Sequence, residues 1–189
     1  MKFFFPFILC ITTLLSACAN APRQFASNDY AADCQRYQRS KNFAAAEYEC
    51  YAALTNVDWG NNPKIKSQRL FNLGIVKQEL GKFSEAELLF KESLQIEEML
   101  SSPRKAVGTR LVELSSTLAG QDKWGEGAPH LEKVLPIALQ FSKQERARLS
   151  QLLLQYHRHL TTMNKAVLAK QFKNTAAMIV DNDTYTFRK

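Results

Sequence analysis

The stretch that decides the fold is Leu70–Leu94, which reads LFNLGIVKQELGKFSEAELLFKESL. Each half of it places small and apolar residues on one face at the 3, 4, 7 spacing of an α-helix. Gly81 interrupts the pattern, as glycine often does where a helix ends. Ser84 and Glu87 have the spacing of a capping box that opens a second helix. Two helices joined by so short a turn are expected to pack antiparallel.

The second half of this stretch has copies elsewhere in the chain. Phe43 and Ala46 repeat Phe83 and Ala86 forty residues earlier, and Trp124 follows Phe83 by forty-one residues. Glycine and proline are scarce, whereas Leu, Ala, Glu, Lys and Gln are common, which favours helices throughout. The sequence therefore predicts an all-α fold of stacked antiparallel helical hairpins, with pairs at about 29–55, 63–100, 103–140 and 142–180.

The order of small and aromatic residues in the central pair resembles that of a tetratricopeptide repeat. It runs through Gly74, Gly81, Phe83, Ala86 and Phe90. The spacing near 40 residues exceeds the 34 of the standard repeat and is similar to that of the long-helix variety, as in kinesin light chain. The resemblance implies a TPR-like α-solenoid over 29–180, with a concave face that serves as the binding surface.

The N-terminus carries the features of a secretory signal. Lys2 precedes an apolar run that is too short to span a bilayer, and small residues close it. The tetrapeptide Leu15–Cys18, LSAC, resembles a bacterial lipobox. That resemblance implies a lipoprotein signal peptide at 1–17, palmitate and further acyl groups on Cys18, and an anchor in the outer membrane on its periplasmic face.

Two short segments are expected to lie outside the folded body. Residues 18–28 lack an apolar period and are predicted to form a flexible tether after the lipidated cysteine. Residues 181–189, DNDTYTFRK, are predicted to form a C-terminal tail or a short docked strand.

Cys34 and Cys50 are the cysteines that remain once Cys10 leaves with the signal and Cys18 is lipidated. They lie at equal distances from Asn42, where the first hairpin turns, so they are expected to face each other. In an oxidising envelope they can form a disulfide. The alternative is a pair of small buried apolar side chains.

The first helix of each pair is expected to line the concave face through residues that the hairpin does not use for packing. Asn72 occupies a position where the family often uses asparagine to hold a peptide backbone. Phe71, Ile75 and Val112 would equally suit packing against the neighbouring pair. The predicted protein-binding residues are Phe71, Asn72, Ile75, Gln78, Glu79, Val112, Glu113, Ser116, Leu154, His157 and Arg158.

The sequence offers no motif for catalysis. His157 and His159 are two residues apart on a helix and point to different sides, so they cannot bind one metal ion from one face. Phosphate-binding loops, H-E-x-x-H and nucleophile motifs are missing from the sequence. We therefore expect a non-enzymatic protein without cofactor, metal or nucleic-acid partner.

The charge is uneven along the chain. The formal net charge is +7, and most of it falls after Ser142, where nine Lys and Arg face three acidic residues. This basic end could contact anionic lipid or cell wall, or be an ordinary solvated helical surface.

The leading hypothesis is a lipid-anchored adaptor that holds an envelope protein or a segment of one. The alternatives are a pilotin-like assembly factor for a secretion or pilus system and a structural lipoprotein that contacts the cell wall.

Overall fold

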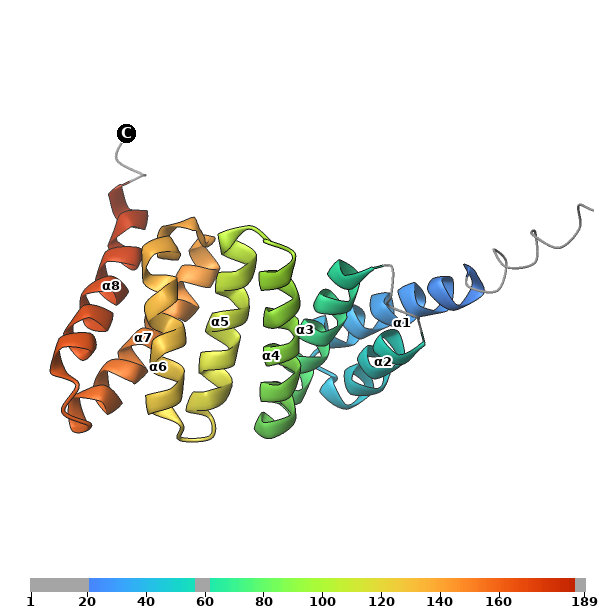
Figure 1. The fold of residues 1–189 in the computed structure, drawn as a ribbon, viewed down its shortest axis with the longest axis horizontal. Helices are drawn as coiled ribbons and strands as arrows, with labels where there is room; N and C mark the ends of the chain where they lie inside the picture. The colour runs from blue at the N-terminus through green and yellow to red at the C-terminus, as the bar shows by residue number, and fades with distance from the viewer. Residues whose placement is uncertain (1–20, 57–61, 186–189) are drawn as a thin grey trace, which may run out of the picture. The chain divides into compact units, whose positions relative to one another are not determined.

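The computed structural model describes residues 21–56 and 62–185, and the side chains of 26–56 and 62–180. The predicted signal peptide, Cys18 and the last four residues lie outside these ranges. The described chain is entirely helical and contains no strand (Figure 1). Its elements are α1 (Ala21–Arg39), α2 (Phe43–Thr55), α3 (Pro63–Glu79), α4 (Phe83–Met99), α5 (Arg104–Ala119), α6 (Trp124–Val134), the 3₁₀ helix η1 (Leu135–Gln140), α7 (Lys143–Thr162) and α8 (Ala166–Tyr185).

The helices divide into two compact units. The first unit extends to Asn61 and contains the α1–α2 hairpin, and the second begins at Asn62 and contains α3 to α8. In the second unit the helices pack as adjacent pairs, α3 with α4, α5 with α6, and α7 with α8 (Figure 1). The prediction of paired helices is therefore confirmed for the described residues.

Several helix ends follow directly from local sequence. Asn62 caps α3 by accepting a hydrogen bond from the backbone of the first turn, and Pro63 occupies the first helical position, where no amide is needed. Gly81 has a φ of +72°, which suits the turn between α3 and α4. Ser142 and Glu145 form the capping box that opens α7, as their spacing predicts.

The capping box predicted at Ser84 and Glu87 is wrong. The N-cap of α4 is Lys82, two residues before Ser84, and it forms no side-chain cap. Glu87 is instead buried and accepts hydrogen bonds from Gln121 Nε2 at 2.8 Å and Lys123 Nζ at 2.9 Å. The carboxylate that could have capped α4 thus holds the turn between α5 and α6.

Both predicted terminal segments are partly helical. The helix α1 begins at Ala21, so most of the expected tether at 18–28 belongs to it. Ser27 explains the extension, because it is buried and donates its hydroxyl to the Ala53 carbonyl of α2 at 2.8 Å. At the other end α8 continues through Tyr185 into the expected tail at 181–189.

One hydrogen bond recurs between the two helices of a pair. A buried serine of the first helix has its hydroxyl within hydrogen-bond distance of a backbone carbonyl of the second helix, 26 residues later in each case. This serine latch joins Ser27 to Ala53, Ser67 to Ser93 and Ser150 to Ala176, at 2.8, 3.2 and 3.0 Å. The single proton of the Ser67 hydroxyl is shared between Ser93 and the nearer Glu97 carboxylate. Three of the four pairs therefore share one helix-to-helix register.

A second contact recurs within the third pair and within the last pair. Ser115 Oγ donates to the Gly127 carbonyl at 3.1 Å, twelve residues later. His157 Nδ1 lies 2.9 Å from the Ala169 carbonyl, again twelve residues later. The α7–α8 pair consequently has the internal arrangement of the earlier pairs.

The third pair departs from the others. Gly108 stands where the serine of the latch would be, and a Cβ there would lie 2.6 Å from Ile137 Cδ1 and 3.1 Å from the Phe141 ring. Pro136 is in the first turn of η1, which replaces the last turns of a regular α6. The chain changes from α-helix to 3₁₀ helix here, because proline lacks the amide donor that a regular α-helix requires.

The core of the second unit is a continuous apolar cluster from α4 to α8. Its largest fully buried side chains include Phe90, Tyr156 and Phe172. Small residues make room for the aromatic rings. Gly74 faces the Phe90 ring, and Gly127 leaves space for the Tyr156 hydroxyl, which donates to the Ser115 carbonyl at 2.8 Å.

A buried carboxylate joins three consecutive helices of this unit. Glu97 of α4 is fully buried and accepts hydrogen bonds from Ser67 Oγ at 2.6 Å and Lys64 Nζ at 2.9 Å, both on α3. Arg110 of α5 approaches it at 3.2 Å. Burial alone would raise the pKa of Glu97, but hydrogen bonds from Ser102, Ser67 and Lys64 and the charge of Arg110 lower it to about 2.

Replacing this carboxylate is expected to destabilise the protein. Glu97→Gln should lower the free energy of unfolding by roughly 3 kcal/mol at pH 7, since it leaves the buried Arg110 guanidinium without its counter-charge. The folded-state pKa is depressed, so the contribution is present above pH 4.5 and is lost as the pH falls toward 2. Urea unfolding across this range should show a shallower acid decline in the variant.

Glu92→Gln is the matched control for this experiment. Glu92 lies on the same helix and pairs with Lys66 at 2.7 Å, but both side chains are partly exposed. A partly exposed pair contributes less than about 1 kcal/mol. Equal losses in the two variants would contradict a special role for Glu97.

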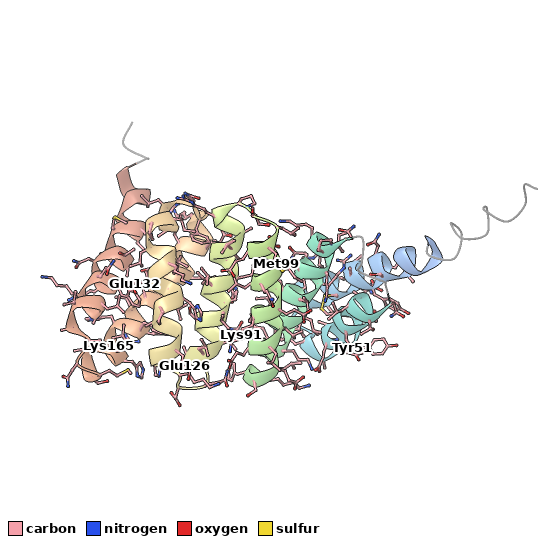
Figure 2. All side chains as sticks on the ribbon, in the orientation of Figure 1. Tyr51, Lys91, Met99, Glu126, Glu132 and Lys165 are labelled. Carbon is pink, nitrogen blue, oxygen red and sulfur yellow. A yellow bond between two sulfur atoms is a disulfide. The ribbon has the colours of Figure 1, made fainter. Side chains whose placement is uncertain are left out.

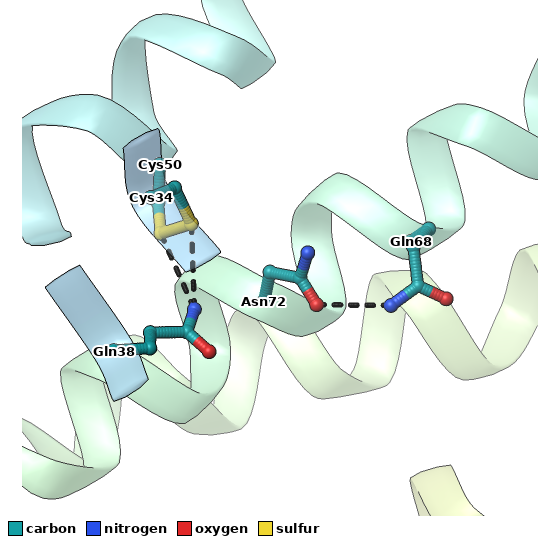
Figure 3. The surroundings of a disulfide bond; sticks show 5 residues. All are labelled: Cys34, Gln38, Cys50, Gln68 and Asn72. Carbon is teal, nitrogen blue, oxygen red and sulfur yellow. Dashed lines mark hydrogen bonds between the residues drawn. A yellow bond between two sulfur atoms is a disulfide. The ribbon is translucent and has the colours of Figure 1, made fainter. Parts of the chain in front are cut away.

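The α1–α2 hairpin of the first unit contains a disulfide. Cys34 and Cys50 are joined with a Cα–Cα distance of 4.9 Å, and both are buried (Figure 3). The amide of Gln38 lies 3.3 Å from Cys34 Sγ and 3.5 Å from Cys50 Sγ. Apart from these sulfurs, the buried apolar side chains that the structure describes in the hairpin, from residue 26 onward, are alanines: Ala31, Ala46, Ala52 and Ala53. So small a core leaves the hairpin dependent on the cross-link.

Removal of the disulfide should loosen this hairpin alone. In the chain-entropy description, closing a loop of this length stabilises by about 3 kcal/mol. The double variant Cys34→Ser/Cys50→Ser should therefore exchange its α1 and α2 amide hydrogens faster, as measured by hydrogen–deuterium exchange mass spectrometry. The amides of α3 to α8 provide the internal control. Unchanged protection in α1 and α2 would contradict the prediction.

Candidate functional site

A hollow of about 420 Å³ lies across the first helices of the last three pairs. We call it the α3–α5–α7 groove. Its volume falls within the range of about 300–1,000 Å³ that is usual for ligand pockets. The lining residues are Ile75, Gln78 and Glu79 of α3, Val112, Glu113 and Ser116 of α5, and Arg148, Gln151, Leu152 and Gln155 of α7.

The groove has an apolar floor and a polar rim. Leu152 is buried, and Ile75 and Val112 are half-buried, whereas the rim side chains of α7 are exposed. Gln78 of α3 donates to Ser116 of α5 at 2.8 Å, which links two of the three lining helices. The arrangement offers apolar contact below and amide groups above.

The structure brings together six of the residues predicted from the sequence to bind a partner. These are Ile75, Gln78, Glu79, Val112, Glu113 and Ser116. Phe71 and Asn72 are not among the lining residues. The Phe71 ring packs against Phe90 at 5.6 Å and under the Arg110 guanidinium at 4.6 Å, which is the packing alternative. Asn72 is only 9% exposed and accepts a hydrogen bond from Gln68 of its own helix at 2.9 Å (Figure 3).

Two of the residues predicted in α7, Leu154 and His157, point away from the groove. They follow Arg148 and Gln151 by six residues each, which rotates them by about 120° around a helix of 3.6 residues per turn. Arg158 follows Gln151 by seven residues, so it lies on nearly the same side of α7 but two turns further along, beyond the lining. His157 faces the Ala169 carbonyl of α8 rather than the groove.

The direction of the groove explains this difference. It is lined by the C-terminal end of α3, the middle of α5 and the N-terminal half of α7, so it crosses the three helices obliquely. The sequence prediction assumes that equivalent positions of successive pairs line the same groove. A sequence repeat shows which positions are equivalent, but the angle at which the groove crosses the helices depends on how successive pairs pack.

The electrostatics of the groove centre on Glu113. Its carboxyl is half-buried on the middle helix, and burial raises its pKa. The charge of Arg148 from α7 lowers the pKa and the charge of Glu79 from α3 raises it, but neither reverses the effect of burial. The ionised form of Glu113 is therefore destabilised in the folded protein.

Neutralising Glu113 should stabilise the protein at neutral pH. A raised folded-state pKa favours the protonated carboxyl, so its contribution is present at low pH and is lost as the pH rises. Glu113→Gln removes this loss, and its free energy of unfolding should exceed that of the wild type by an amount that grows above pH 4.5. Urea unfolding at several pH values would measure the difference.

Glu132→Gln is the control for this measurement. Glu132 is exposed on α6, away from the groove, and should show no such pH-dependent gain (Figure 2). A lower stability of Glu113→Gln at neutral pH would mean that Arg148 compensates the carboxylate fully.

The described side chains contain no group of three or more His, Cys, Asp or Glu placed to hold a metal ion. None of the helices between residues 21 and 185 has the combination of length and apolarity that crossing a bilayer requires.

Comparison with known proteins indicates fold similarity only. No protein-family model matches the chain, and no curated protein matches it. The structure is similar to the one titled "Crystal structure of BtubC (BKLC) from P. vanneervenii", with a TM-score of 0.64. The match covers 89% of this chain and 67% of that chain, at 14% sequence identity. At this identity the likeness concerns the arrangement of helices.

Proposed function

We propose that the protein is a non-catalytic adaptor that binds an extended segment of a partner protein in the α3–α5–α7 groove. The observation that carries the proposal is the groove itself, which crosses the first helices of three successive pairs. Its side-chain amides, on Gln78, Gln151 and Gln155, can donate to and accept from a peptide backbone. Its apolar floor can take up alternate side chains of such a segment.

The arrangement of the pairs supports a TPR-like repeat architecture. The serine latch and the twelve-residue contact recur in successive pairs, as they would in an array of equivalent hairpins. The helical similarity to BtubC agrees with this reading. In such arrays the first helices face the binding surface, which is where the groove lies.

The N-terminal sequence supports a place in the bacterial envelope. The lipobox-like Leu15–Cys18 would allow lipid attachment to Cys18 and an outer-membrane anchor on the periplasmic face. The disulfide between Cys34 and Cys50 suits an oxidising compartment. The adaptor would then hold its partner close to the membrane surface.

Site-specific photocrosslinking in the native host would test the adaptor function. A photoreactive benzoylphenylalanine at Gln151, on the rim of the groove, should give a discrete covalent adduct with an envelope protein. The same residue at Glu132, on the exposed surface of α6, is the matched control and should give none (Figure 2). Adducts at Glu132 but not at Gln151 would refute binding in the groove.

The anchor is tested separately by metabolic labelling. The wild-type chain should incorporate radiolabelled palmitate and sediment with membranes, and Cys18→Ala should do neither. Palmitate incorporation that persists in Cys18→Ala would show that another residue carries the lipid. Failure of this test would leave the groove proposal unchanged.

A further inference from the structure

Three charged side chains surround the α3–α5–α7 groove without forming ion pairs. Among the described side chains, Glu79, Glu113 and Arg148 take part in no hydrogen bond and no salt bridge. Glu79 and Glu113 lie on adjacent lining helices and repel each other, as the effect of Glu79 on the pKa of Glu113 shows. The groove thus contains two carboxylates and one guanidinium that form no direct ion pair with one another.

Two buried carboxylates of this unit, unlike Glu113, are in direct contact with cations. Glu87 is contacted by Lys91 and Lys123, and Glu97 by Lys64 and Arg110. In both cases the hydrogen bonds and cations outweigh burial and lower the pKa to about 2. Among the described side chains no cation contacts Glu113 directly, and Arg148 acts on it only at longer range. A cation from a bound partner would supply the counter-charge that lysine and arginine side chains supply to Glu87 and Glu97.

We propose that the groove selects a peptide segment with a lysine or arginine side chain, which is seated between Glu79 and Glu113. This proposal rests on the proposed function and specifies the partner of the same site. A cation in that position relieves the repulsion between the two carboxylates and pairs with the one that burial destabilises. Arg148 repels a cation at the α7 side, so the basic side chain is directed toward α3.

The dimensions of the groove fit a short extended segment. Helices that pack side by side are about 9 Å apart, so α3 and α7 are separated by about 18 Å. An extended chain covers this distance in about five or six residues. The basic side chain would occupy the α3–α5 part of the groove, and apolar neighbours in the segment would contact Val112 and Leu152 on the floor.

The space beneath Glu113 limits how deeply the side chain can enter. A second hollow borders Val112, Glu113 and Arg148 on the side toward Phe141, but it holds only about 30 Å³. That is room for about one water molecule. The cationic head group therefore stops at the Glu113 carboxylate.

Selection from a phage-displayed library of random nonapeptides would test the proposal. The bait is the full-length lipid-carrying protein in detergent. The wild type should enrich peptides with one lysine or arginine among apolar residues. The Glu79→Gln/Glu113→Gln variant should lose this enrichment, and Glu132→Gln should retain it. Glu113→Gln is expected to fold, because removing its charge stabilises the protein.

A binding cycle with one selected peptide gives the quantitative test. Fluorescence anisotropy should show that lysine→glutamine in the peptide weakens binding about tenfold or more, and that Glu113→Gln in the protein does the same. Combining both changes should add little to either loss, because each removes the same contact.

The outcomes separate the two proposals. Selected peptides without basic residues, or additive losses in the cycle, would overturn the cationic specificity. If Gln151→Arg still abolished binding of those peptides, the adaptor function would stand. If Gln151→Arg had no effect either, the peptides would bind elsewhere, and the groove would be overturned as the binding site as well.

Discussion

The arrangement of α3, α4 and α5 depends on the Glu97 carboxylate. One fully buried charge of α4 receives hydrogen bonds from two residues of α3 and faces Arg110 of α5. A buried carboxylate is tolerated only when its partners are held in place, so each partner fixes the position of its helix. Since α3 and α5 both line the groove, this network helps to hold two of the three lining helices in place.

Much of the fold is written in the local sequence. Three local patterns mark helix ends in the structure. Asn62 followed by Pro63 opens α3, Gly81 lies in the turn after α3, and Ser142 with Glu145 three residues later opens α7. The spacing of the repeat also indicates which helices pair. The serine latch was not noticed in the sequence, although serines 27, 67 and 150 each precede a small residue by 26 positions. A search for that spacing could have identified the fourth pair as equivalent to the others.

The features that sequence reasoning missed depend on tertiary contacts. The helical state of residues 21–28 is supported by a contact between Ser27 and α2, not by an apolar period. Glu87 has the spacing of a cap, but it accepts hydrogen bonds from Gln121 and Lys123 of a distant turn instead. Leu154, His157 and Arg158 occupy equivalent positions in the repeat but do not line the groove, because the groove crosses the helices obliquely. These three features depend on how the helices pack against one another, and the spacing of apolar residues along the sequence does not determine that packing.

Gly108 controls the other half of the groove. It lies one turn before Val112 on α5, and its missing side chain is replaced by Ile137 and Phe141, which lead the chain into α7. A methyl group at this position would push α5 away from the segment that leads into α7. The distance between α5 and α7, which both line the groove, would change although no lining residue had been altered. A buried glycine remote from any partner thus offers a way for related chains to tune the calibre of the groove.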